Sequence, residues 1–188
     1  MPRPARIDRA QIVQATLELL DEQGMTGLSM RALATRLGVR AASLYNHVAG
    51  REDLQRLVAD SIWTELVEQL NADGGWRDLL EQLAVSVRNA LRAHPGAAQL
   101  LAVTDASEGA YEPAVRLVIQ AFADTSLPDD DALLLVSTLG VLVIGLAAAE
   151  FGDVPNPPVA PQEYYDHWFE LAVGVFLDGV AARLGIGS

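Results

Sequence analysis

Residues 28–48 read LSMRALATRLGVRAASLYNHV, a pattern typical of two short helices joined by a tight turn. Ser29 is a good N-cap, because its hydroxyl can accept a hydrogen bond from the first turn of a helix over residues 30–36. Gly38 suits the turn, and a second helix is expected from about residue 40 to residue 47. Two short helices joined by a three-residue turn that contains glycine have the spacing of a helix-turn-helix.

The side chains of these two helices divide into a buried and an exposed set. Ala34 is small where the helices are expected to cross, and Leu44 is expected to pack into the small core between them. Ser29 and Arg31 stand at the start of the first helix, where free backbone N–H groups favour phosphate. The second helix then presents an outer face that can enter the major groove of DNA, made of Arg40, Ala41, Ala42, Ser43, Asn46 and His47.

Residues 12–57 as a whole resemble the DNA-binding region of the TetR family of one-component transcriptional regulators. The resemblance rests on LSMRALA at 28–34, LGV at 37–39 and SLYNHV at 43–48. It implies that five side chains face base edges: Arg31, Arg40, Ala41, Ala42 and Asn46. It implies that five others hold phosphates: Ser29, Ser43, Tyr45, His47 and Arg51. Because arginine pairs readily with guanine, Arg31 is the candidate for a bidentate base contact.

Two features depart from the family's pattern. Arg51 stands where the family usually has lysine, which keeps the charge and changes the geometry of the phosphate contact. Ala41 and Ala42 offer only apolar contacts, such as one with a thymine methyl group, so base specificity would depend on few side chains. Arg3 and Arg6 precede the first helix and form either an arm toward the minor groove or a solvated tail.

The composition is that of a folded protein with a substantial apolar core. The chain has 188 residues, of which 51% are hydrophobic, and it contains no cysteine. The length fits one or two domains, and the lack of cysteine excludes a disulfide framework, thiolate catalysis and cysteine-ligated zinc. No apolar run follows the first residues, MPRPAR, so no signal peptide is visible and we expect a cytoplasmic protein.

The charge is divided unevenly along the chain. The net charge of the whole chain is −12, which by itself argues against a nucleic-acid partner. Residues 1–60, however, carry eight arginines and seven acidic residues, a net charge of +1, whereas residues 61–188 carry −13. A DNA partner would therefore be attracted to the first third of the chain and repelled by the rest.

Apolar residues recur at helical spacing through the chain, and no stretch shows the two-residue alternation of a half-buried strand. A capping box at Asp8-x-x-Gln11 begins the first helix, which reaches Gly24. Further helices are expected at 51–70, 76–93, 97–103, 108–124, 129–151 and 161–184. We therefore predict an all-α protein, with a three-helix helix-turn-helix DNA-binding domain over residues 1–50 and a helical ligand-binding and dimerisation domain over residues 51–188.

Residues 132–149 are an uncharged run, ALLLVSTLGVLVIGLAAA, which by length alone is a candidate membrane span. Acidic residues at its ends, without flanking arginine or lysine, argue for a buried helix instead. In the TetR family the last two long helices pair with their copies in a four-helix bundle. The resemblance thus implies a homodimer through helices 129–151 and 161–184, with no membrane partner, and two heads that read a palindromic operator in double-stranded DNA.

Residues 76–96, with Gly145 and Glu150 further on, resemble the C-terminal domain of the tetracycline-repressor branch of the family. Val67 stands where that branch has its drug-sensing histidine, so we expect a small-molecule inducer other than a magnesium–tetracycline complex. Large apolar side chains and a few polar ones are the candidates for its pocket: Trp63, His94, Leu101, Thr104, Tyr111, Ser137 and Trp168. For each of them, ordinary core packing is the more common explanation.

The sequence does not indicate an enzyme. The three histidines lie far apart in the chain, and no phosphate-binding glycine loop, nucleophile elbow or metal-ligand spacing occurs. We therefore predict no catalytic residues, no metal site and no cofactor. The sequence favours a repressor that binds operator DNA and is released by an unidentified small molecule. A DNA-binding regulator without a ligand stays open as the alternative.

Overall fold

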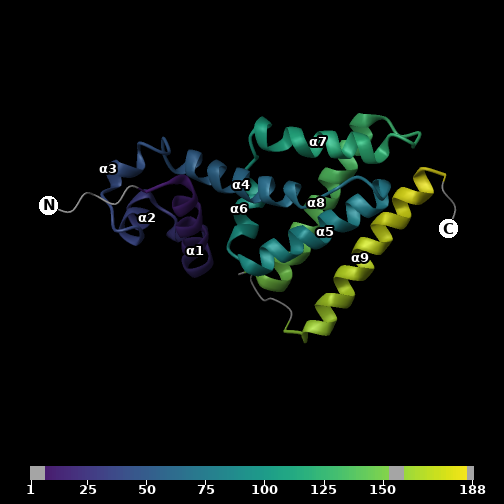
Figure 1. Cartoon of the computed structure of the whole chain (residues 1–188). Helices are drawn as coiled ribbons and strands as arrows, with labels where there is room; N and C mark the ends of the chain where they lie inside the picture. The colour runs from purple at the N-terminus through teal and green to yellow at the C-terminus, as the bar shows by residue number, and fades with distance from the viewer. Residues whose placement is uncertain (1–6, 153–158, 186–188) are drawn as a thin grey trace.

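The computed structural model describes residues 7–152 and 159–185. Within these ranges the regular elements are all helices: α1 (Arg9–Gly27), α2 (Met30–Arg36), α3 (Ala41–Leu44), α4 (Arg51–Glu68), α5 (Gly75–Ala93), α6 (Ala97–Val103), α7 (Glu108–Phe122), α8 (Asp129–Phe151) and α9 (Gln162–Arg183). The helices α1–α3 form a small head at one end of the molecule, and α4 runs from it into a larger body, α5–α9 (Figure 1). The predicted all-α class is confirmed. The proposed arm with Arg3 and Arg6 lies outside the described residues.

Local signals in the sequence account for most of the helix ends. Asp8 begins α1 through a capping box with Gln11, and Gly24, with a φ of 62°, interrupts that helix where its end is predicted. The helices α2, α6 and α8 have the predicted bounds. The prediction for α3 was too long, because the helix ends at Leu44. The next residues form a turn in which the His47 N–H donates to the Leu44 carbonyl, three residues back.

A small apolar core holds the head together. Leu33 and Leu44 are fully buried, and Ala34 is 5% exposed, as the sequence predicts for the crossing of α2 and α3. Gly38 lies in the turn with a φ of 66°, a left-handed conformation that favours glycine. The N–H of Val39 donates to the Ala34 carbonyl and closes the turn. These contacts hold α3 in a fixed orientation on α2.

The central helix of the body is α8. It packs against α5, α6, α7 and α9, and its first turn carries three aspartates whose charges suit a helix N-terminus. Among the described helices, α8 is the one that could cross a membrane by length and composition alone. Of its most apolar 18 residues, 33% are buried. One copy of the chain therefore leaves much of an apolar helix uncovered.

Two neighbouring apolar stripes remain exposed on α8 and α9, and we call them together the α8/α9 face. On α8, Leu134 and Val141 are 65% and 73% exposed; on α9, Tyr164, Leu171 and Val175 are 50%, 56% and 65% exposed. Spacings of seven and four residues place each set on one side of its helix. The two helices pack against each other. Exposed apolar side chains on two helices that pack together are typical of a protein–protein contact.

Candidate DNA-binding face and ligand cavity

The predicted DNA-contacting side chains lie on the surface of the head and at the start of α4. Ser43 and His47 are half-buried, and Tyr45 is 55% exposed. The Ser29 Oγ accepts from the Ala32 N–H at 3.1 Å and so caps α2 as predicted. The exposed members of the set are Ser29, Arg31, Arg40, Ala41, Ala42, Tyr45, Asn46 and Arg51. Guanidinium and hydroxyl groups on such a surface can donate to phosphate and to base edges.

Two arginines of this region are engaged within the protein. The Arg51 Nη2 donates to the Met25 carbonyl at 2.7 Å and ties the start of α4 to the end of α1. Arg36 pairs with Glu22 and, at 3.1 Å, with Glu18. These hydrogen bonds, the one to Glu22 above all, raise the pKa of Arg36. Arg51 therefore has a structural contact beside the phosphate contact predicted for it, and Arg36 belongs to the packing of α2 on α1.

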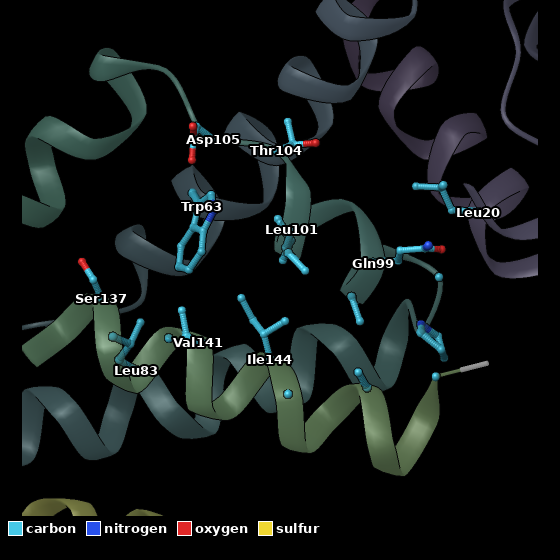
Figure 2. Close-up of a pocket in the computed structure, with 18 of the residues that line it drawn as sticks. Leu20, Trp63, Leu83, Gln99, Leu101, Thr104, Asp105, Ser137, Val141 and Ile144 are labelled. Atoms are coloured by element: carbon cyan, nitrogen blue, oxygen red, sulfur yellow. The ribbon is translucent and has the colours of Figure 1, made fainter. Parts of the chain in front are cut away.

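A cavity of about 1490 Å³ lies where the head meets the body. Its wall comes from the end of α1 and from α4, α5, α6, α7 and α8. Figure 2 shows apolar side chains such as Leu101, Val141 and Ile144 along it, with a few polar ones such as Gln99 and Ser137 between them. Small-molecule sites are usually about 300–1,000 Å³, with mostly apolar walls and a few polar groups. This cavity has room and chemistry for such a ligand.

The structure places five of the seven predicted pocket residues on this wall: Trp63, Leu101, Thr104, Tyr111 and Ser137. It places the other two elsewhere. His94 follows α5 and donates its backbone N–H to the Ala90 carbonyl. Trp168 lies on α9 beside Tyr164, with ring centroids 6.1 Å apart. The sequence alone does not indicate which side of a helix will face a cavity, because tertiary packing determines the orientation of the helix.

The contribution of α1 to the cavity was not predicted from the sequence. Residues 20–26, which belong to the head, line it at one end. The one signal in this stretch is Gly24, and its positive φ is consistent with a helix that must stop and turn there. The cavity is therefore shared between the head and the body.

Asp21 joins this end of α1 to the loop between α5 and α6. Its Oδ1 accepts from the Gly96 N–H at 2.9 Å, and its Oδ2 lies 2.8 Å from the His94 Nδ1. Gly96 packs so closely on the backbone of Leu20 that a Cβ at this position would overlap the Leu20 carbonyl. The head and the body are thus held together by a close backbone contact beside the cavity.

The Gly96→Ala variant is expected to lose about 1–3 kcal/mol of unfolding free energy, the usual cost of forcing extra atoms into a packed contact. Urea-induced unfolding followed by circular dichroism measures this loss. Gly109→Ala is the matched control, because a Cβ at that helical position meets no atom within 4 Å. The control is expected to be neutral or slightly stabilising. Equal losses in the two variants would contradict the close contact.

An ion cluster around the buried pair of Arg88 and Glu150 joins α5 to α8 and α9. The Arg88 Nε and Nη2 donate to Glu150 at 2.9 and 2.8 Å, and Nη2 also donates to Asp166 at 2.7 Å. The Arg88 guanidinium carbon lies 4.6 Å from the centroid of the Phe169 ring. Burial disfavours the charge on Arg88, but its hydrogen bonds with Glu150 and Asp166 outweigh this and raise its pKa. The bond from Arg88 lowers the pKa of Asp166. The cluster fixes α5, α8 and α9 relative to one another.

Two family models match the chain. Residues 12–56 match the model described as bacterial regulatory proteins, tetR family. Residues 69–163, half of the chain, match the model described as tetracyclin repressor-like, C-terminal domain. The first match contains the exposed face of the head, and the second contains most of the body's share of the cavity.

Curated relatives of the chain are named as transcriptional regulators or repressors. An uncharacterized HTH-type transcriptional regulator from Mycobacterium tuberculosis is 43% identical over 65 residues, 35% of this chain and 30% of that protein. An HTH-type transcriptional regulator from Saccharopolyspora erythraea is 33% identical over 140 residues, 74% of this chain and 59% of that protein. The matches thus span less than two thirds of either relative. The tetracycline repressor protein class A from transposon 1721 of Escherichia coli is 28% identical over 194 residues, 92% of this chain and 89% of that protein.

Solved structures share the whole architecture. A possible TetR family transcriptional regulator from Streptomyces coelicolor A3(2) has a TM-score of 0.77 at 26% identity, over 94% of this chain and 100% of that chain. A TetR variant from Acinetobacter baumannii AYE, in complex with minocycline, has a TM-score of 0.81 at 23% identity, over 95% of this chain and 98% of that chain. At 23% identity, the similarity to the Acinetobacter structure shows a shared fold alone.

Proposed function

Because the chain belongs to the TetR family of bacterial transcriptional regulators, we propose that it is a repressor that a small-molecule inducer releases from a palindromic DNA operator. In this proposal residues 1–50 are the DNA-binding domain, and residues 51–188 are the ligand-binding and dimerisation domain. The observation that carries it is that residues 20–26 of the head form part of the cavity wall. A ligand in the cavity would therefore touch the DNA-binding unit directly.

The proposed operator contacts are nine side chains of the head and Arg51 at the start of α4. Arg31, Arg40 and Asn46 would meet base edges, with Ala41 and Ala42 against apolar groups such as thymine methyls. Ser29, Ser43, Tyr45, His47 and Arg51 would donate to phosphates. The uneven charge supports this orientation, because residues 61–188 carry a net charge of −13 and would keep the body away from DNA.

The proposed dimer forms through the α8/α9 face. Its exposed apolar side chains, such as Leu134 and Val175, would be covered by the same face of a second copy. Pairing with a second copy would bury the apolar side chains of α8 that one chain leaves exposed. Because these side chains then need no lipid, we propose a cytoplasmic protein with no membrane partner. Two heads about 34–36 Å apart, one turn of DNA, would read the two halves of a palindrome.

Release of the operator needs a ligand that binds the DNA-free conformation more tightly than the DNA-bound one. A ligand with equal affinity for both conformations would not shift the equilibrium between them. The head is joined to the body by α4 and by the contact of Asp21 with Gly96. A ligand that moves α1 or α4 would change the distance between the two heads. A coupling of about 1–3 kcal/mol would already change operator affinity roughly 5–150-fold.

The proposal is tested by selecting bound fragments from the source genome at about 150 mM salt. We expect the unchanged protein to enrich a palindromic site and Tyr45→Ala to lose it, because Tyr45 would donate to a phosphate. Failure to enrich any sequence would contradict operator binding. An enriched site that no compound releases would favour a regulator without a ligand.

Arg31→Ala is expected to weaken binding to the selected operator by about 1–3 kcal/mol and to relax the preference at one base pair of each half-site. Fluorescence anisotropy on operators with single base changes, at one salt concentration, measures both effects. Arg116→Ala is the matched control, because it removes the same charge from an exposed position on the body. Uniform weakening on all sequences would show that Arg31 contacts a phosphate and no base.

A further inference from the structure

The charged side chains on the wall of the cavity are all acidic. Asp21, Glu22 and Asp105 line it, and no arginine, lysine or histidine side chain does so among the described residues. The other lining residues are apolar or carry neutral polar groups. A negatively charged ligand would therefore find no cation in this wall and would have to approach three carboxylates.

The three carboxylates are not equally free to attract a ligand. Asp21 accepts from Gly96 and lies against His94, and Glu22 pairs with Arg36. Asp105, in contrast, forms no hydrogen bond or ion pair within the part of the chain that the structure describes. It is exposed, in the loop between α6 and α7. Of the three carboxylates, Asp105 is thus the one without a partner among the described residues.

Asp105 and Trp63, the largest aromatic side chain of the wall, both line the cavity. Figure 2 shows the Asp105 carboxylate and the Trp63 indole at the same end of the cavity, with Ser137 and Leu83 below them. The face of an indole attracts cations, and a nearby carboxylate adds a direct charge interaction. This end of the cavity therefore offers two kinds of attraction to one positive charge.

We propose that the inducer is an apolar molecule with a positive charge, such as an amine or a quaternary onium ion. Its cationic group lies between Asp105 and Trp63, and its apolar body lies against the wall around Leu101 and Ile144. The chain's net charge of −12 adds a general attraction for cations. That such a ligand releases DNA rests on the proposed function, whereas its binding to the cavity does not.

Tetraphenylphosphonium and tetraphenylborate are a suitable pair of probes, because they share a shape and have opposite charges. Isothermal titration calorimetry with the full chain, in the absence of DNA, measures the affinity of each. We expect the cation to bind at least about tenfold more tightly than the anion, from the carboxylate and the indole together.

Two variants distinguish the attraction of the cation to Asp105 from its attraction to the net negative charge of the chain. Asp105→Asn is expected to weaken binding of the cation about threefold to fivefold, as for a partly solvated ion pair. Asp124→Asn removes the same charge from an exposed position away from the cavity wall and is expected to leave the affinity unchanged. Equal effects in the two variants would overturn the role of Asp105.

Binding of the anion as tightly as the cation, or binding of neither ion, would overturn the proposal. Addition of the selected operator then tests release separately. A cation that binds through Asp105 and leaves the operator occupied would support the proposed ligand class and contradict ligand-induced release.

Discussion

The Arg88→Ala variant is expected to lose about 3–5 kcal/mol of unfolding free energy, because it leaves a buried carboxylate without its partner. The Glu150 side chain is 4% exposed and accepts two hydrogen bonds from Arg88. Gln162 still donates to Glu150 at 2.6 Å, but it carries no charge. Arg92, 3.6 Å from Glu150, offsets part of the buried charge. We therefore expect a loss near the lower end of this range.

Urea-induced unfolding at one fixed protein concentration measures the loss, because the stability of the proposed dimer depends on concentration. Arg77→Ala is the matched control. It breaks a surface pair, with Asp178 at 3.1 Å, that stabilises by less than about 1 kcal/mol. Replacing both Arg88 and Glu150 with leucine should recover much of the stability, since no unpaired charge remains buried. A loss as small as that of Arg77→Ala would contradict the role of the cluster.

The helices of the head were predictable because their signals lie within a few residues of each helix end. The Ser29 cap and the left-handed Gly38 bracket α2 and its turn. The end of α3 was not predictable in this way. Residues 45–47 keep helical sequence character, and a turn forms there with hydrogen bonds back to Ser43 and Leu44. Packing of Leu44 and Val48 into the head favours that turn over another helical one.

The candidate site was predictable only in part, because it is assembled by contacts between distant segments. Trp63 and Tyr111 were proposed from their size and polarity, and the structure places both on the cavity wall. Asp105 has no local feature that distinguishes it from other loop acids. The contact of Asp21 with Gly96 joins residues 75 apart in the chain, and that of Arg88 with Glu150 joins residues 62 apart. No spacing rule for helices or turns extends over such separations.

The variant with both Leu171→Glu and Val175→Glu is expected to be monomeric and to bind the operator at least about 100-fold more weakly. These two residues are 56% and 65% exposed on α9, so the charges do not disturb the core of one chain. In the proposed dimer they would be buried against a second copy, where four unpaired carboxylates would have to lose their water. A monomer also binds each half-site separately and loses the roughly 10²–10⁴-fold gain that two linked heads provide.

Sedimentation velocity gives the oligomeric state, and fluorescence anisotropy with the selected operator gives the affinity. Val85→Glu is the control, because Val85 is 50% exposed on α5, outside the α8/α9 face. It should stay dimeric and keep its affinity. Circular dichroism should show the same helix content in all three proteins, so that loss of folding is distinguished from loss of pairing. A doubly substituted protein that remained a dimer with full operator affinity would place the subunit contact elsewhere on the surface, and the exposed stripes of α8 and α9 would then need a different partner.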